Sequence, residues 1–468
     1  MKRTKIICTI GPSSETPATL QKMIRAGMNV CRLNMSHGTY AWHGRAIRTI
    51  RTAAKKTGEP VAILIDLQGP KARIGELVIS NLKLVIGQKL VFTTQSNNSI
   101  THNPITKIPI AVPNFHKYAK KGAHLLIADG TIECVVEEVR DRDIHAKVTL
   151  GGELKSHKGI AIAGVSLPLP SLTSKDKNDA AWARGQDIDF VALSFVKRPA
   201  DVVALRRLLK KPELHIIVKI ETREAVQNFD EILREADGIM IARGDLALAT
   251  SPEEVPIIQK ELIEKCRRMA VPVIVATEML ASMERSPRPS RAEASDVANA
   301  VIDHTDATML SGESASGQFP VEAVATMAHI IKKTEASRFD DLSIGGEITH
   351  GPREEEVALL AAVRARTEEA KAILAGSLTG HTGRLLSRYR TEVPLIVGSP
   401  DWRVVHQLNL SWGVRPFLVP RVKTMDALLK LLLAQAKKSG LKKRSKIVIL
   451  GSEKIIPHGQ SFVGTRTL

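Results

Sequence analysis

The sequence predicts an α/β protein: a (β/α)₈ TIM barrel with an inserted small β-barrel lid domain, followed by a C-terminal doubly wound α/β domain. Three observations support this prediction. Short apolar runs alternate with helical segments, a long β-like segment follows the third run, and a second alternation begins after about residue 340. The expected boundaries are 1–69 with 168–340 for the barrel, 70–167 for the lid and 341–468 for the last domain.

Eight apolar runs have the length and composition of buried parallel strands. Each is followed by a helical segment, which is the order of a β-then-α unit. After the first run, Thr16 is a candidate helix cap, Pro17 suits the first turn of a helix and Gly27 suits its end. The runs begin near residues 5, 29, 62, 189, 215, 238, 271 and 307 (KIICTI, NVCRLN, AILIDL, DFVALSF, HIIVKI, GIMIAR, VPVIVAT and ATMLSG).

The segment from Lys71 to Leu167 has a different character. Short β-like runs alternate there with Gly, Asn and Asp turns, and few helical patterns are present. The runs are 89–94 (KLVFTT), 123–128 (AHLLIA), 133–139 (ECVVEEV) and 144–150 (IHAKVTL). Its connections to the barrel, Gly69-Pro70 and Leu167-Pro168, contain proline. We therefore expect a small β domain on stiff hinges, which suits a mobile lid.

The C-terminal part begins with a Gly-rich stretch at 343–352 (SIGGEITHGP), which is expected to be a linker. Helices and strands then alternate, which predicts an open, doubly wound sheet. The expected helices are 354–367, 383–390, 402–410 and 425–438, and the expected strands are 372–377, 393–399, 414–419 and 446–452.

The composition narrows the class of protein. The chain has 67 Lys and Arg against 49 Asp and Glu, a net charge of +18, which suits polyanionic substrates or nucleic acid. The basic residues are spread along the chain and aromatics make up only 3% of it, so a small-molecule enzyme is favoured and no nucleic-acid partner is expected. The four cysteines form no close pair, and no signal-like or membrane-length apolar stretch is visible. We expect a cytoplasmic protein without membrane association.

Polar residues at the ends of two neighbouring strands suggest an active site. Lys219 and Glu221 lie two residues apart, so on a strand they point to the same face. Asp245 follows the next apolar run, where a barrel strand would deliver it to the same mouth. Two acids and one lysine are a plausible site for a divalent metal and an anionic substrate, which points to phosphoryl or enolate chemistry.

The second run ends with alternating polar residues, Arg32, Asn34 and Ser36. An amphipathic edge strand would also show this alternation, but a central barrel strand is expected to be apolar on both faces. Three polar groups there would be costly unless they are used, so a functional role is favoured.

Six motifs, in order and spacing over essentially the whole chain, resemble the pyruvate kinase family. The resemblance implies transfer of a phosphoryl group from phosphoenolpyruvate to ADP, giving pyruvate and ATP, with Mg²⁺ or Mn²⁺ as cofactor and usually a homotetrameric assembly. The alternative is another phosphoenolpyruvate-using barrel enzyme, of the lyase or carboxylase type, which needs no ADP site. The motifs are 9–14 (TIGPSS), 32–38 (RLNMSHG), 66–73 (DLQGPKAR), 242–246 (ARGDL), 276–280 (ATEML) and 288–299 (RPSRAEASDVAN).

The resemblance also implies roles for individual residues. Glu221 and Asp245 would hold Mg²⁺, and the catalytic residues Lys219 and Arg32 would neutralise the oxygens of the moving phosphoryl group. Substrate binding is implied for Arg32 and Lys219, and also for Gly244, Asp245 and Thr277, whose backbone amides and hydroxyl would hold the substrate carboxylate. Thr277 or a water near it would protonate the enolate.

The nucleotide is expected between barrel and lid, with Asn34, His37, Arg73 and Lys175 as its contacts by family match. No Walker-type Gly-x₄-Gly-Lys loop and no Gly-x-Gly-x-x-Gly motif occurs in the sequence. Side chains and metal must therefore hold the phosphates.

Many members of the family bind K⁺ beside the phosphoryl group. Here the run 67–71 (LQGPK) resembles a potassium-independent branch in which the ammonium of Lys71 supplies the fixed charge, so K⁺ is not expected to be required. An ordinary solvated lysine is the alternative. The vestigial potassium ligands would be Asn34, Ser36, Asp66 and the carbonyl of Leu67.

The segment 377–383 (SLTGHTG) joins a strand to a helix in the C-terminal domain. It matches the effector loop of the family, which implies that Ser377, Thr379, Gly380 and Thr382 bind a phosphorylated allosteric effector. A capped turn without ligand is equally favoured, because Leu378 occupies the position where the family usually has lysine.

Overall fold

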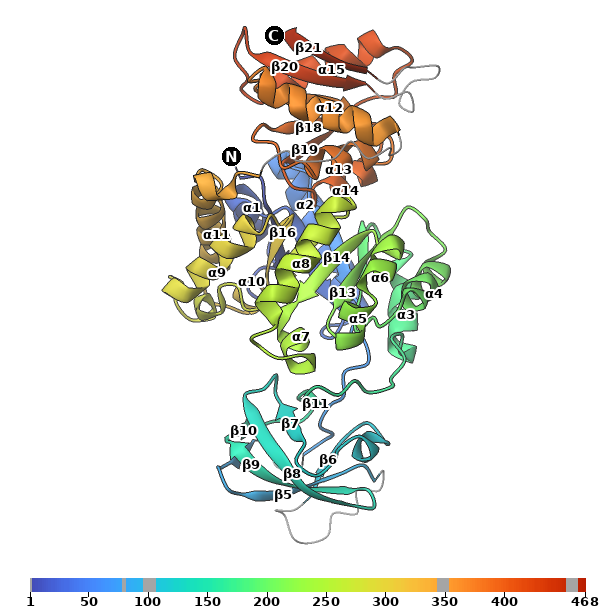
Figure 1. The fold of residues 1–468 in the computed structure, drawn as a ribbon, viewed down its shortest axis with the longest axis vertical. Helices are drawn as coiled ribbons and strands as arrows, with labels where there is room; N and C mark the ends of the chain where they lie inside the picture. Colours follow the sequence, from blue (N-terminus) through green and yellow to red (C-terminus); the bar gives the residue numbers. More distant parts are fainter. Residues whose placement is uncertain (1, 78–80, 96–106, 343–352, 452–461) are drawn as a thin grey trace.

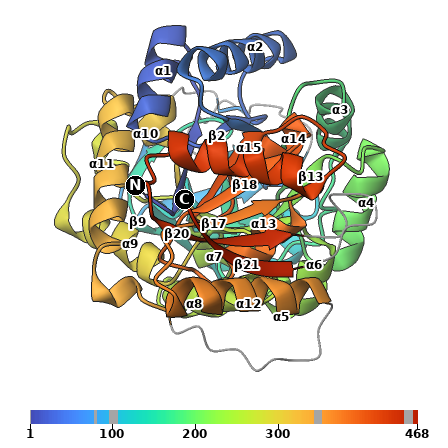
Figure 2. The same cartoon turned by 90° about the horizontal axis from the view of Figure 1, so that it is seen from above.

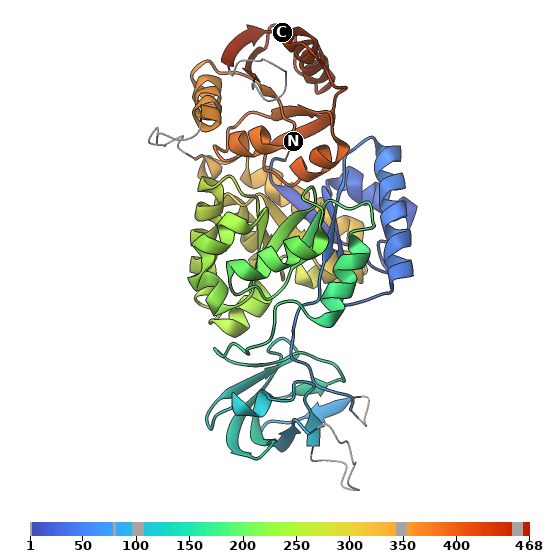
Figure 3. The same ribbon diagram turned by 90° about the vertical axis from the view of Figure 1, so that its right-hand side faces the viewer.

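The computed structural model describes residues 2–77, 81–95, 107–342, 353–451 and 462–468. The protein is elongated, with the barrel in the middle, the inserted β domain at one end and the C-terminal domain at the other (Figures 1 and 3). The linker predicted at 343–352 lies outside the described residues.

The centre of the molecule is a closed barrel of parallel strands in the order β1-β16-β15-β14-β13-β12-β3-β2. All eight predicted strands are confirmed. The inserted domain leaves the barrel after β3 and returns before β12. The strands are β1 (Lys5–Thr9), β2 (Val30–Asn34), β3 (Ala62–Asp66), β12 (Phe190–Leu193), β13 (His215–Ile220), β14 (Gly238–Ala242), β15 (Val273–Ala276) and β16 (Ala307–Leu310).

A ring of helices surrounds these strands. The first helix begins and ends as predicted, because Thr16 Oγ1 accepts a hydrogen bond from the Thr19 amide and Gly27 adopts a φ of 126° at the end. The helices are α1 (Pro17–Ala26), α2 (Tyr40–Thr57), α3 (Ser174–Ala183), α4 (Pro199–Leu209), α5 (Arg223–Gln227), α6 (Phe229–Glu235), α7 (Arg243–Ala249), α8 (Val255–Arg268), α9 (Arg291–Ile302), α10 (Gly312–Ala315) and α11 (Pro320–Thr334).

The barrel strands are apolar on both faces, which explains why they appear in the sequence as continuous runs. One set of side chains, including Ile7, Leu64, Ile217 and Met240, fills the barrel interior. A larger set packs between the strands and the helices. Leu410 of the C-terminal domain joins the interior cluster, so that domain is anchored on the barrel.

The inserted domain is a curled sheet in the order β11-β7-β8-β9-β5-β6, with a separate pair β10-β4. Single bridges from Arg73 to Gly159 and from Ile74 to Ile110 link its two edges, which gives the small barrel that the sequence predicts. The strands without a predicted counterpart have three residues each, too short for an alternation to be visible. The strands are β4 (Leu82–Leu84), β5 (Lys89–Thr93), β6 (Lys107–Pro109), β7 (His124–Ile127), β8 (Ile132–Arg140), β9 (Asp143–Leu150), β10 (Gly152–Leu154) and β11 (Ile160–Ile162).

The C-terminal domain is a sheet in the order β19-β18-β17-β20-β21 with helices on both faces, as Figure 2 shows from above. One face packs on α12, α13 and α14, and the other face packs on α15. The edge strand β21 is antiparallel and was not predicted. The elements are α12 (Arg353–Thr367), β17 (Ile373–Gly376), α13 (His381–Ser387), β18 (Leu395–Ser399), α14 (Trp402–Leu408), β19 (Val414–Leu418), α15 (Met425–Lys438), β20 (Lys446–Gly451) and β21 (Phe462–Thr467). None of the helices in the described ranges is long and apolar enough to cross a membrane.

Candidate active site

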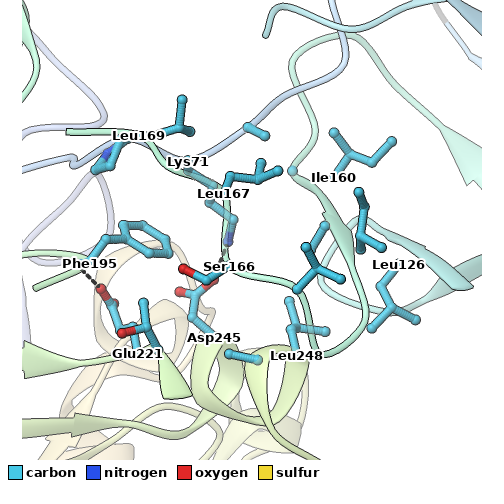
Figure 4. A pocket seen from close by; sticks show the side chains of 18 of the residues that line it. Lys71, Leu126, Ile160, Ser166, Leu167, Leu169, Phe195, Glu221, Asp245 and Leu248 are labelled. Atoms are coloured by element: carbon cyan, nitrogen blue, oxygen red, sulfur yellow. Dashed lines mark hydrogen bonds and ion pairs between the residues drawn. The ribbon is translucent and has the colours of Figure 1, made fainter. Parts of the chain in front are cut away.

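The barrel mouth and the inserted domain together enclose a pocket (Figure 4). Lys71 and Asp129 line it from the inserted domain, and Phe195, Glu221 and Asp245 line it from the barrel. The barrel residues follow the carboxyl ends of β12, β13 and β14, where the active sites of such barrels are found.

Lys219, on β13, lies at the centre of a charged cluster. Its Nζ is 2.9 Å from Glu221 Oε1 and 3.5 Å from Asp66 Oδ1, and it donates to Ser194 Oγ at 2.9 Å. Burial lowers the pKa of Lys219, but the two carboxylates outweigh burial and raise it. The lysine is therefore a fixed cation at the mouth of the barrel.

Arg32 shares a carboxylate with Lys219. Its Nε donates to Asp66 Oδ2 at 2.7 Å, and its Nη1 donates to Thr9 Oγ1 at 2.9 Å. Burial raises the pKa of Asp66, but the two cations outweigh burial and lower it. An ionised Asp66, 1% exposed, thus holds two cations side by side, which is a suitable arrangement for an anionic group.

Glu221 and Asp245 offer oxygen ligands for a metal. Glu221 Oε2 accepts a hydrogen bond from the Phe195 amide at 2.7 Å (Figure 4), and Oε1 lies 2.9 Å from Lys219 Nζ in an ion pair. Burial and the charge of Asp245 raise the pKa of Glu221 despite Lys219. A divalent cation would relieve this repulsion. The described residues contain no group of three or more His, Cys, Asp or Glu that would form an all-protein metal cage. Mg²⁺, which keeps several waters and takes one or two carboxylates, fits this donor set.

Lys71 links the inserted domain to the barrel. Its Nζ lies 2.7 Å from Asp245 Oδ1 (Figure 4) and 2.8 Å from Asp129 Oδ1, and among the described residues its ammonium has no other hydrogen-bond or ion-pair partner. Burial lowers the pKa of Lys71, but Asp245 and Asp129 outweigh burial and raise it. Lys71 is therefore not an ordinary solvated lysine.

The start of α7 is held against the end of β15. Thr277 Oγ1 accepts a hydrogen bond from the Gly244 amide at 2.9 Å. Thr277 and Glu278 have φ values of 73° and 55°, which is unusual for a β-branched residue such as threonine. Arg243 fixes this turn by donating to Thr277 O at 2.8 Å and to both carboxylate oxygens of Asp296. Backbone strain of this kind is concentrated at functional sites.

The four predicted nucleotide contacts lie on separate segments, and none of them is among the residues that line the pocket. Asn34 Oδ1 accepts from the Ser36 amide, and His37 is exposed. Lys175 donates to Met35 O at 2.7 Å, so it lies beside the turn that contains these residues. Arg73 donates to the carbonyl of His157 within the inserted domain.

Three of the four predicted potassium ligands, Asn34, Asp66 and the carbonyl of Leu67, are engaged with other protein groups. The carbonyl of Leu67 accepts from Ser194 Oγ at 2.8 Å, Asn34 accepts from the Ser36 amide, and Asp66 pairs with Arg32 and Lys219. Lys71 forms no hydrogen bond or ion pair with any of the four, all of which lie in the described ranges.

The predicted effector loop connects β17 to α13. The Ser377 amide donates to Gly398 O in the sheet, and Gly380, with a φ of 80°, precedes the helix without a side-chain cap. The carbonyl of Thr379 accepts from Arg384 at 3.4 Å, and Thr382 is half-buried. The loop therefore has the shape of a tight turn at the start of a helix of seven residues.

Sequence reasoning missed Ser194, Asp129, Arg243 and Asp296 as residues of this site. Arg243 and Asp296 belong to motifs that were recognised, so their charges were a usable signal. Ser194 is a polar residue near the end of the predicted run 189–195 (DFVALSF), which was also a usable signal. Asp129 carries no local signal, because it reaches the site only through contacts between distant segments.

Comparison with known proteins agrees with the geometry. The family model "Pyruvate kinase, barrel domain" matches residues 1–324, and "Pyruvate kinase, alpha/beta domain" matches residues 355–461. A Geobacillus stearothermophilus protein named pyruvate kinase is 43% identical over 456 residues, which cover 96% of this chain and 77% of that protein. A protein of the same name from Clostridium acetobutylicum is 39% identical over 457 residues, which cover 97% and 96% of the two chains.

Proposed function

Because the chain belongs to the pyruvate kinase family, and is an enzyme that transfers a phosphoryl group between phosphoenolpyruvate and ADP, we propose that Lys219, Glu221 and Asp245 form its catalytic centre. The contacts of Lys219 with Glu221 and with Asp66 are the observation that carries this assignment. They hold a cation beside two acids at the mouth of the barrel, and charge stabilisation is the main requirement of phosphoryl transfer.

Each side chain has a role in this proposal. Glu221 and Asp245 would hold Mg²⁺, which the family generally uses, or Mn²⁺, and the metal would stabilise the negative oxygen of the enolate. Lys219 and Arg32, both held by Asp66, orient and neutralise the phosphoryl oxygens.

The remaining contacts to phosphoenolpyruvate come from the start of α7 and from Thr277, which follows β15. The amides of Gly244 and Asp245 and the Thr277 hydroxyl bind the substrate carboxylate. The Thr277 Oγ1 to Gly244 contact supports this role, because it preorganises both groups. Thr277, or a water beside it, delivers the proton to the enolate.

The nucleotide is placed between the mouth and the lid, residues 70–167, with Asn34, His37, Arg73 and Lys175 near its phosphates. Support for a ligand between the two domains comes from the pocket, which both domains line, although these four residues do not line it. The proline-containing connections at Gly69-Pro70 and Leu167-Pro168 suit hinges. In this proposal the lid closes over the nucleotide and excludes water.

A coupled assay for pyruvate and ATP formation tests the function directly. We expect ATP formation that depends on both ADP and phosphoenolpyruvate and is abolished by chelation of divalent metal. Consumption of phosphoenolpyruvate without ADP would instead indicate the lyase or carboxylase alternative.

We also propose that Lys71 makes K⁺ unnecessary, as in a potassium-independent branch of the family. Its ammonium is held at the mouth by Asp245 and Asp129, and a K⁺ ion a few ångströms away would be repelled. The wild-type enzyme is therefore expected to run at nearly full rate when the only monovalent cation is a bulky organic one. Steady-state rates with and without K⁺ measure this.

Lys71→Glu removes the internal cation and adds an acid, so activity is expected to fall unless K⁺ is supplied. Adding Leu67→Thr and Gln68→Lys is expected to improve the response to K⁺. A strong K⁺ requirement of the wild-type enzyme would contradict this role of Lys71.

For regulation we propose that Ser377, Thr379, Gly380 and Thr382 bind a phosphorylated effector. The combined change Thr379→Ala and Thr382→Ala is expected to abolish activation and leave the basal rate intact, because both hydroxyls are far from the barrel mouth. Activation assays with a panel of sugar phosphates and nucleotides measure this. If no activator is found, the loop is a plain structural turn.

A homotetrameric assembly and a cytoplasmic location complete the proposal, since both follow from the family. Sedimentation equilibrium of the purified chain tests the first, and fractionation of the source cells tests the second.

A further inference from the structure

Basic residues from several segments come together at one end of the C-terminal domain. Within residues 427–452 the sequence has seven Lys and Arg and no Asp or Glu. This stretch covers most of α15, the turn that follows it and β20. The fold adds Lys371, which lies just before β17, and Arg466, which lies near the end of β21.

Backbone hydrogen bonds hold these segments side by side. The amide of Lys371 donates to the carbonyl of Lys446 at 2.8 Å, and the amide of Arg444 donates to the carbonyl of Leu468 at 2.9 Å. Strand β21 runs antiparallel to β20, so its last residues lie beside the first residues of β20. Together the segments form one basic surface, which consists of Lys371, Lys437, Lys438, Lys442, Lys443, Arg444, Lys446 and Arg466.

The side chains of the basic surface are exposed, and none of them forms an ion pair with a residue that the structure describes. One acid, Glu368 just after α12, interacts with Lys446, but it also pairs with Arg364 at 2.7 Å. A single exposed lysine needs no partner. Eight cations from four segments, with no acid among them, produce a strong positive potential at this end of the domain.

The composition of the basic surface indicates which polyanion it fits. Six of its eight residues are lysines and none is aromatic. Nucleic-acid recognition relies on arginines that read base edges and on aromatic side chains that stack on bases, and both are scarce here. Lysine ammonium groups are compact, hydrated point charges, which suit a plane of anionic headgroups without a defined geometry.

We propose that the basic surface binds reversibly to an anionic lipid membrane through the phospholipid headgroups. Leu468, which is bonded to Arg444, lies at one extremity of the elongated molecule, and the lid lies at the other (Figures 1 and 3). A protein docked by this end keeps the barrel mouth and the lid in solvent. The attraction is between exposed charges, so salt weakens it.

Cosedimentation of the full chain with lipid vesicles tests the proposal. The protein should bind mixed vesicles of phosphatidylcholine and phosphatidylglycerol at an ionic strength of about 0.15 M, and it should not bind vesicles of phosphatidylcholine alone. Binding should weaken steadily as salt is added. Bound protein should keep its activity in the coupled assay, because the barrel mouth stays free.

The combined change Lys442→Glu and Lys443→Glu should weaken binding to the mixed vesicles by about tenfold or more, because it reverses two charges of the basic surface. Its turnover number in solution should equal that of the wild-type protein, which shows that the fold is intact. The matched control is Lys120→Glu with Lys121→Glu, an exposed pair of neighbouring lysines in the lid. It changes the net charge equally but at the other end of the molecule, so it should bind as the wild-type protein does.

A second variant, Lys437→Gln with Lys438→Gln, removes two charges without adding acids and should cause a smaller loss of binding. An equal loss in the lid control would overturn the proposal, because net charge and not the basic surface would then be responsible. Failure of the wild-type protein to bind the mixed vesicles would overturn it as well. If duplex DNA or RNA at equal phosphate concentration displaces the protein from the vesicles, the partner is a nucleic acid and the membrane proposal is wrong.

Discussion

Replacing Glu221 by glutamine is expected to reduce turnover by roughly 10³-fold or more. Removing a single hydrogen bond to the transition state typically reduces turnover by about 10²–10³-fold, so the expected effect lies at or above that range. Glu221 is one of the two proposed metal ligands, and the substitution removes its negative charge. That charge also pairs with Lys219. Asp245→Asn is expected to have an effect of the same order. The measurement is kcat at several concentrations of Mg²⁺, followed by pyruvate formation.

The fold of Glu221→Gln should survive, because the amide oxygen still accepts a hydrogen bond from the Phe195 amide. Glu231→Gln is the matched control, since Glu231 is exposed on α6 and has no contact with the mouth of the barrel. It should leave kcat unchanged. Near-normal activity of Glu221→Gln at ordinary Mg²⁺ concentrations would refute the assignment of the metal site.

The barrel could be predicted from the sequence because burial on both faces gives each parallel strand an apolar run, as in 215–220 (HIIVKI). The edge strand β21 had no such signal, because Phe462–Thr467 is exposed or half-buried along its whole length. The three-residue strands of the inserted domain are defined by their partners across the sheet, and local sequence does not encode those partners.

The same distinction holds in the active site. Lys219, Glu221 and Asp245 could be predicted because a barrel brings the ends of successive strands to one mouth. Asp129 could not, because it reaches Asp245 only through Lys71 and across the boundary between lid and barrel. The left-handed conformation of Thr277 was also invisible in the sequence, since a threonine gives no reason to expect it.

The second large effect is expected for Lys219→Met, which should depress phosphoryl transfer by several orders of magnitude and enolate protonation much less. The ammonium is fixed at 2.9 Å from Glu221 and 3.5 Å from Asp66, beside Arg32, where charge on the moving phosphoryl group must be balanced. Proton transfer to the enolate carbon does not move that charge. The first half-reaction is measured by ATP formation, and the second by exchange of the pyruvate methyl protons in D₂O followed by NMR.

Lys177→Met is the matched control for this change, because Lys177 is exposed on α3 and its side chain forms no hydrogen bond or ion pair with the described residues. It should preserve both half-reactions. Lys219→Met also leaves Asp66 with one cation fewer, so the pKa of Asp66 should rise, and Arg32 alone should keep it ionised. Equal losses in the two half-reactions would show that Lys219 only maintains the shape of the mouth, because a merely structural lysine has no reason to separate phosphoryl transfer from proton transfer.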